Sequence, residues 1–156
     1  MLGLSFVREY QFLALVTTSG LLTHTSVMDI KKQEIPIYLY FIATPIILIG
    51  QIATKTPIIP QLVAMLVMFV LYFVQALYSE GGGDIIMMSF LGFALGLYPC
   101  LGAIILSFPF IFLYIGYKVF FKKGKLTEII KTSYPVAPFI TLGLISYLAL
   151  SYFLTI

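Results

Sequence analysis

Tryptophan is absent from the sequence, and cysteine and acidic residues are rare. The 156 residues include one cysteine and six aspartate or glutamate residues. Because Cys100 stands alone, the sequence offers neither an internal disulfide nor a cysteine-rich zinc site, and no metal or other cofactor is expected. Charged residues make up only 10% of the chain, whereas hydrophobic residues make up 61%. This composition leaves too little polar surface for a soluble globular protein, and no nucleic-acid partner is expected.

Long apolar runs are what the sequence has in abundance. They reach about 20 residues, which as an α-helix crosses a hydrocarbon core of roughly 30 Å. Membrane-spanning β-strands would instead alternate in polarity over about 10 residues. The sequence therefore predicts an all-α, polytopic membrane protein with a single transmembrane domain over residues 1–156. The six expected transmembrane helices are 10–28, 35–53, 58–77, 85–98, 101–117 and 136–153.

The stretch 85–117 decides the number of spans. It has no charged residue over 33 positions, and as one helix it would be roughly 50 Å long. That length exceeds one membrane crossing. Pro99 lacks a backbone donor and biases the preceding residue away from helix, so the sequence predicts a break at 98–102. Six spans follow, with both termini on the same side.

The lysine distribution orients this bundle. With the N-terminus outside, seven basic residues fall in cytoplasmic loops and two outside, in agreement with the positive-inside rule. Asp29, after the first span, and Asp84, before the fourth, then share the cytoplasmic face. A five-span topology with the N-terminus inside gives the same charge count but places both aspartates outside. The predicted break near Pro99 therefore decides between the six-span and the five-span topology.

Two carboxyl groups on one membrane face suggest a chemistry. When close enough to share a proton, they can hold a water molecule and hydrolyse a peptide bond without a metal. Asp84 opens a helix, where exposed N–H groups favour the anion, whereas Asp29 follows a helix C-terminus, where the dipole disfavours it. We therefore expect Asp84 to be the base and Asp29 the acid that holds the proton. Lys31 and Lys32 oppose this assignment of Asp29.

A run of three glycines precedes Asp84. Glycine can take a positive φ and lets another backbone approach closely, so the run is suited to binding an extended substrate. The alternative interpretation is a tight loop in which Asp84 only caps the following helix. The Gly-Gly-Gly-Asp sequence by itself leaves both interpretations open.

Two motifs together resemble those of the type IV prepilin and preflagellin peptidases, a family of GxGD-type membrane aspartyl proteases. The first family motif is an aspartate, five residues and then Ile-Pro, which matches Asp29, Ile35 and Pro36. The second is the glycine turn that ends at Asp84. The proline-rich segment 134–139 is similar to the start of the family's last core span. The resemblance covers essentially the whole chain.

The resemblance implies an endopeptidase that removes the short basic leader of a prepilin, pseudopilin or archaellin-type precursor. The reaction is expected at the cytoplasmic face of the cytoplasmic membrane, next to the hydrophobic segment of the substrate. Asp29 and Asp84 are implied as the catalytic pair, with an activated water. The expected substrate-binding or loop-shaping residues are Gly81, Gly82, Gly83, Ile35, Pro36 and Glu80. Zinc binding and N-methylation are not expected, because the paired CxxC motifs of larger members are missing.

Two positions depart from the family pattern. Ile37 stands where an asparagine is common, and Ile86 stands where a lysine is common. Loss of that lysine is expected to alter the proton affinity of the carboxyl pair or its substrate contacts.

Two further expectations concern partners and a rival function. The basic segment 118–125 predicts binding to anionic lipid headgroups, at on the order of 1 kcal/mol per lysine. A small proton-coupled transporter or channel subunit is the alternative, with Asp29 and Asp84 as relay carboxylates. Such a protein should carry carboxylates in mid-span or show repeated halves, and the sequence shows neither.

Overall fold

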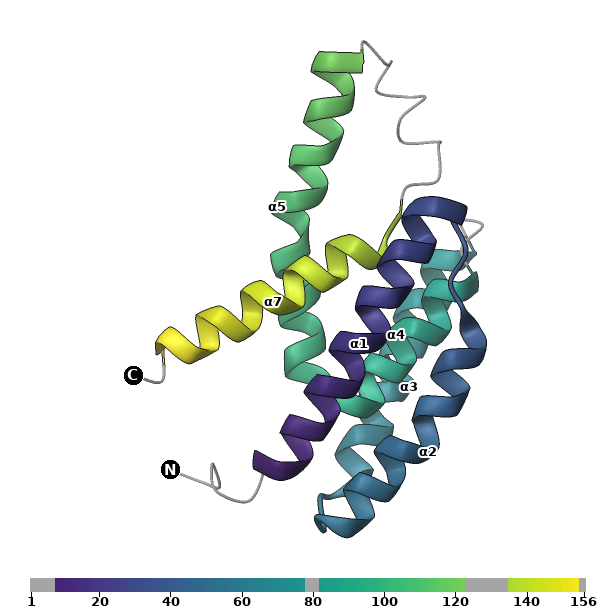
Figure 1. Cartoon of the computed structure of the whole chain (residues 1–156), viewed down its shortest axis with the longest axis vertical. Helices are drawn as coiled ribbons and strands as arrows, with labels where there is room; N and C mark the ends of the chain where they lie inside the picture. Colours follow the sequence, from purple (N-terminus) through teal and green to yellow (C-terminus); the bar gives the residue numbers. More distant parts are fainter. Residues whose placement is uncertain (1–7, 78–81, 123–134, 155–156) are drawn as a thin grey trace.

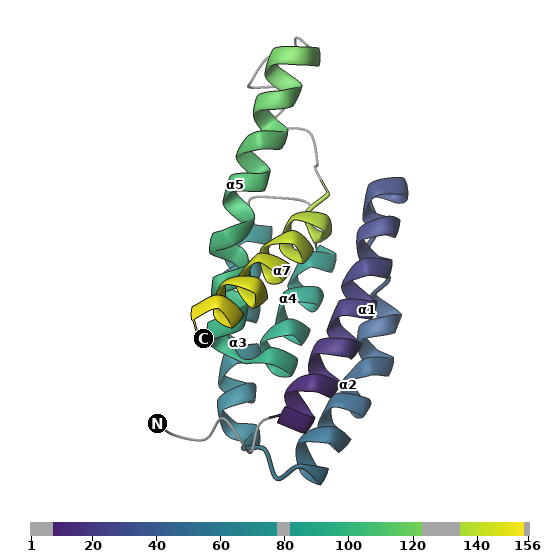
Figure 2. The same cartoon turned by 60° about the vertical axis from the view of Figure 1, so that its left-hand side comes forward.

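The computed structural model describes residues 8–77, 82–122 and 135–154, and these residues form α-helices and short connections. The helices are α1 (Arg8–Lys32), α2 (Ile37–Ala53), α3 (Ile58–Ala76), α4 (Gly82–Leu95), α5 (Leu97–Lys122) and α7 (Ala137–Leu154). In Figure 1, α1 to α4 run side by side, α5 rises past the end of the bundle, and α7 crosses it obliquely. The turned view in Figure 2 shows the same arrangement. The prediction of an all-α fold is confirmed.

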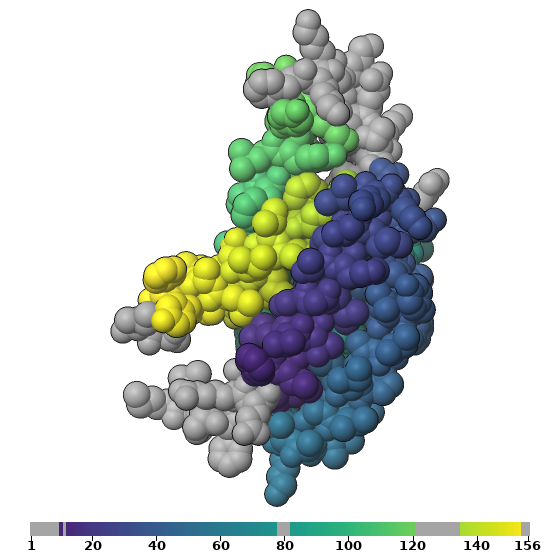
Figure 3. Space-filling view, viewed as in Figure 1, coloured from purple at the N-terminus to yellow at the C-terminus, as the bar shows by residue number. Residues whose placement is uncertain are grey.

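The central helix is α4, which packs against α1, α2, α3 and α5. Half of its 14 residues are buried, among them Met87, Met88 and Phe90. Its closest neighbour is α3, because Gly92 lacks a side chain: a Cβ there would lie 2.7 Å from the carbonyl oxygen of Ala64. In the space-filling view of Figure 3, α1, α2 and α7 cover this central helix. The N-terminus of α4 carries Asp84.

The C-terminus of α4 is capped inside the bundle by side chains of α1 and α2. Gln51 donates from Nε2 to the carbonyl oxygen of Phe93 at 3.1 Å and to the Tyr10 hydroxyl at 2.8 Å. Tyr10 in turn donates its hydroxyl proton to the carbonyl oxygen of Ala94 at 2.7 Å. Both side chains are buried, and the last carbonyls of a helix have no partner within the helix. This network therefore satisfies backbone groups that would otherwise be costly to bury.

The break between the fourth and fifth helices lies earlier than predicted. It is at Gly96, whose φ of 85° ends α4, and α5 begins at Leu97. The predicted position at 98–102 was wrong because Pro99 lies in the first turn of α5, where its missing N–H would have no helical partner anyway. The fifth helix then continues for 26 residues to Lys122, through Pro109.

The first helix also extends past its predicted end, by four residues from position 28 to Lys32. The next residue, Gln33, takes a left-handed φ of 55° and donates its backbone N–H to the carbonyl oxygen of Asp29 at 3.0 Å, which terminates the helix. Asp29 therefore lies in the last helical turn rather than after it.

The outward faces of the helices are strongly apolar. Phe41 is 67% exposed, Phe112 69% and Phe153 73%. Two helices of the described residues, Ile58–Ala76 and Leu97–Phe120, are long and apolar enough to cross a membrane by length and composition. The shorter apolar helices are Ile37–Ala53, Gly82–Leu95 and Ala137–Phe153. The topology of six crossings stays a prediction.

Candidate active site

Asp29 lies near the C-terminus of α1 and Asp84 near the N-terminus of α4, and these two helix ends lie at the same end of the bundle (Figure 1). Both residues lie outside the predicted spans 10–28 and 85–98. The charge of Asp29 acts on the Asp84 carboxyl group, and both charges act on Tyr40 of α2. The fold thus brings the two predicted carboxyl groups close enough to interact electrostatically with each other and with Tyr40.

The Asp29 carboxylate is held by the N-terminus of α7. Its Oδ2 accepts the backbone N–H of Ala137, the first residue of α7, at 3.0 Å. The backbone of Val136 also contributes a hydrogen bond. Burial raises the pKa of Asp29, which is 7% exposed, and these two backbone donors oppose that rise. A helix N-terminus carries partial positive charge, so this contact offsets part of the effect of burial on Asp29.

The Asp84 carboxyl group has a different environment. It is the third residue of α4 and is partly buried, and none of the described residues donates a hydrogen bond to it. Burial, and then the negative charge of Asp29, raises the pKa of Asp84 to about 6. Burial thus raises the pKa of both carboxyl groups, and backbone donors among the described residues oppose the rise at Asp29. The assignment of acid and base expected from sequence considered only the dipoles of α1 and α4 and not the N–H groups of α7, and it stays a prediction.

The Ile-Pro motif packs against the glycine motif. A Cβ on Gly83 would lie 2.9 Å from the Cβ of Ile35. Pro36, the residue after Ile35, is buried. Gly82 is exposed, with open space where a side chain would be. Gly82 and Gly83 are the first residues of α4, and neither has a positive φ. The role expected from a positive φ therefore does not hold for these two glycines; Gly83 instead permits close packing.

Two of the predicted loop-shaping residues, Glu80 and Gly81, lie outside the described residues.

Sequence reasoning missed a hydrogen-bonded pair next to the carboxyl groups. The Tyr40 hydroxyl lies 2.7 Å from Oγ1 of Thr25. Thr25 comes four residues before Asp29, and Tyr40 comes four residues after Pro36. Residues four apart on a helix share a face, so the spacing of Thr25 and Asp29 on α1 was the signal available in the sequence.

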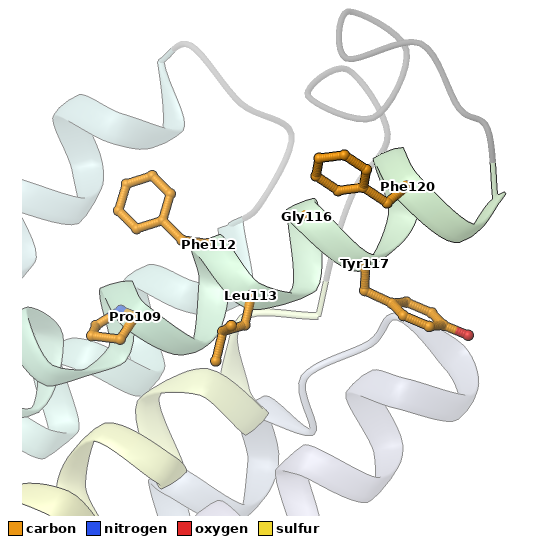
Figure 4. A pocket seen from close by; sticks show the side chains of 6 residues that line it. All are labelled: Pro109, Phe112, Leu113, Gly116, Tyr117 and Phe120. Atoms are coloured by element: carbon orange, nitrogen blue, oxygen red, sulfur yellow. The ribbon is translucent and has the colours of Figure 1, made fainter.

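The protruding part of α5 carries a separate apolar groove. Figure 4 shows its lining residues, which are Pro109, Phe112, Leu113, Gly116, Tyr117 and Phe120. None of these side chains is a carboxyl or imidazole group, so the groove offers mainly apolar contact. Within the described ranges, no three histidine, cysteine or acidic side chains are grouped as metal ligands would be.

Replacing Ala137 by proline tests the contact that holds Asp29. Proline lacks the N–H but is tolerated at the first position of a helix, so α7 is expected to begin normally. A hydrogen bond to a charged group contributes about 1.5–3 kcal/mol, which predicts a rise of roughly one to two units in the pKa of Asp29. Infrared titration of the carboxyl groups in detergent measures this rise. Ala137→Val also enlarges this buried side chain but keeps the N–H, and it should leave the titration unchanged; equal shifts in both variants would contradict the assignment.

By its fold and its site, the chain is an α-helical membrane protein with an interacting pair of carboxyl groups at one end of its bundle. Residues 16–117 match the type IV leader peptidase family. This match covers more than half of the chain, so the chain belongs to that family, as the two motifs predicted, and is a peptidase. No curated protein and no solved structure matches the chain.

Proposed function

We propose that this peptidase is an aspartic endopeptidase that removes the basic leader of prepilin, pseudopilin or archaellin-type precursors. The observation that carries this proposal is the electrostatic coupling of Asp29 and Asp84, with the pKa of Asp84 raised to about 6. Two carboxyl groups that share one proton can act as a base and an acid in the same step. Membership of the leader peptidase family supports the class of substrate.

In the first step, Asp29 acts as the base. Its anion, held by the Ala137 N–H, takes a proton from a water molecule placed between the two carboxyl groups. The oxygen of that water attacks the carbonyl carbon of the scissile peptide bond. Asp84 donates its proton to the carbonyl oxygen, and a neutral tetrahedral diol results.

In the second step, the diol collapses and the C–N bond breaks. Asp29, now protonated, gives its proton to the leaving nitrogen, while Asp84 takes back the proton from a diol hydroxyl. The products are a new carboxyl group on the leader and a free amine on the mature protein. Both aspartates return to their starting protonation states, so the cycle consumes only water.

The proposed location is the cytoplasmic membrane, with six crossings and the site at the cytoplasmic face. Lys31 and Lys32 lie in the last turn of α1, next to Asp29, which agrees with the positive-inside rule. Single cysteines introduced near Lys118, in a background without the buried Cys100, test the orientation. They should resist an impermeant thiol reagent added to intact cells, and labelling from outside would overturn this topology.

The basic segment 118–125 is proposed to bind anionic lipid headgroups. Of its described lysines, Lys118 lies 4.8 Å from the ring centroid of Tyr114, so it is held against α5 by a cation–π contact.

Cleavage of a synthetic substrate tests the function. The purified protein in detergent or liposomes is mixed with a prepilin that carries its leader and hydrophobic segment, and the products are weighed by mass spectrometry. A loss equal to the leader mass is expected. If no precursor of any of the three kinds is cleaved, the proposal fails. Proton-driven transport in liposomes would then favour the rival function, although Asp29 and Asp84 lie in terminal helical turns and not at mid-helix, where relay carboxylates are expected.

A further inference from the structure

Tyr40 and Thr25 form a buried hydrogen-bonded pair that the proposed mechanism does not use. Tyr40 is 1% exposed and Thr25 is fully buried. The distance between the Tyr40 hydroxyl and the Thr25 Oγ1 is 2.7 Å, and either oxygen can be the donor. Buried hydroxyl groups are generally paired, so this contact by itself is compatible with a purely structural role.

The position of Tyr40 goes further than a structural role requires. Its ring packs edge-on against Phe90 of α4, with ring centroids 5.3 Å apart and an interplanar angle of 65°. Its hydroxyl bonds to Thr25 of α1. A single side chain of α2 therefore touches both helices that carry the aspartates, and its ring orientation is fixed from two sides.

The charges around Tyr40 single out the carboxyl pair. Asp29 and Asp84 both act electrostatically on it. On α1 and α4, which pack against α2, His24, Lys31 and Lys32 are exposed, and Tyr10 is bonded at the opposite end of the bundle. A phenol keeps its proton at neutral pH and can donate it. When Thr25 donates to the Tyr40 oxygen, the phenolic proton is free for another acceptor, and Thr25 lies one helical turn before Asp29 on the same face of α1.

We propose that Tyr40, oriented by Thr25, is a positioning residue that stabilises the single negative charge of the Asp29–Asp84 pair. The inference rests on the proposed function, because it assigns Tyr40 a part in the same acid–base step. The proposed effect of Tyr40 is on the proton affinity of the carboxyl pair, and this effect exists whether or not a substrate is present. A donor aimed at a carboxylate favours the anion and so lowers the pH at which the pair loses its protons.

Tyr40→Phe is the principal test, because it removes the hydroxyl and keeps the ring against Phe90. Infrared titration of the carboxyl groups, made without substrate, should show the titration of the pair moved to higher pH by roughly half a unit to one unit. In the cleavage assay, kcat should fall by on the order of tenfold with KM unchanged, and the whole pH profile should move to higher pH.

Variants of Thr25 separate orientation from packing. Thr25→Val keeps the shape and removes the hydroxyl, so it should shift the titration in the same direction as Tyr40→Phe, but less. Thr25→Ser keeps the hydroxyl and should restore the wild-type titration. A loss of packing alone would affect the serine variant at least as much as the valine variant.

Tyr10→Phe is the matched control. Tyr10 is also a buried tyrosine with a bonded hydroxyl, but it caps α4 at the end away from the aspartates. This variant should melt at a lower temperature with an unchanged carboxyl titration. The inference is overturned if the titration of Tyr40→Phe coincides with wild type, or if Tyr10→Phe shifts it as much. Because the titration needs no cleavage, this result is independent of whether a prepilin is the substrate.

Discussion

Replacing either Asp29 or Asp84 by asparagine is expected to lower the cleavage rate by on the order of 10²- to 10⁴-fold. Asp29→Asn removes the group that takes the proton of water, and Asp84→Asn removes the acid that protonates the carbonyl oxygen. An amide has nearly the shape of a carboxyl group, so the fold should be kept. The measurement is kcat for a purified prepilin substrate, with helical content followed by circular dichroism.

The pH dependence of the wild-type rate follows from the same assignment. The pKa of Asp84 is raised from 3.8 to about 6, so the acid is lost and the rate falls as the pH rises through about 6. The pKa values seen in the pH profile of the rate belong to the coupled pair of carboxyl groups and not to either group alone. A raised pKa in the folded state gives stability that is present below the unfolded value and lost as the pH rises through about 6. The melting temperature should therefore be higher at pH 5 than at pH 7, and Asp84→Asn should reduce this difference.

Glu34→Gln is the control for the asparagine variants of Asp29 and Asp84. Glu34 is an exposed carboxylate five residues after Asp29, so it shares the sequence neighbourhood but not the buried site. Its replacement should change the rate by less than about twofold. An asparagine variant of Asp29 or Asp84 that keeps wild-type activity would rule out the two-carboxyl mechanism.

Gly83→Ala is expected to lower the cleavage rate by about 10- to 100-fold. The new methyl group would lie 2.9 Å from the Cβ of Ile35, which is fixed to the backbone, so the start of α4 must move away from the connection between α1 and α2. Asp84 is the next residue and would move with it. A misplacement of about 1 Å at a reacting group can cost about 10²-fold in rate. The prediction is checked by kcat at saturating substrate.

Gly82→Ala is the matched control, one residue away on the same helix. A methyl group there meets no atom within 4 Å, and alanine favours helix more than glycine does. The rate should stay within about twofold of wild type, and the melting temperature should not fall. If both alanine variants lose activity equally, the close approach to Ile35 is not the reason that position 83 is glycine.

Much of the helical framework could be predicted from the sequence. The hydrophobic runs predicted the order of the helices, and the motifs predicted the family. What failed were boundaries that depend on partners distant in sequence. Pro99 predicted a break by its local chemistry, but the break occurs at Gly96, where Tyr10 and Gln51 cap the freed carbonyls of α4.

The environment of the two aspartates also depends on a partner that is distant in sequence. The dipoles of α1 and α4 are local properties and were available from the sequence. The donor that bonds Asp29 is 108 residues away, at Ala137. No periodicity or spacing relates these two positions, because their contact depends on the oblique packing of α7 across α1 (Figure 1).

That contact also bears on how much of the chain the proposed mechanism needs. The segment 16–117 matches the family and contains both aspartates, both motifs and the Tyr40–Thr25 pair. It does not contain α7, whose first N–H group bonds the Asp29 carboxylate. A fragment cut after α5 would keep Asp29, Asp84 and both motifs and still lack the N–H group that bonds the proposed base. The proposed mechanism therefore needs more than the matched segment, at least as far as the beginning of α7.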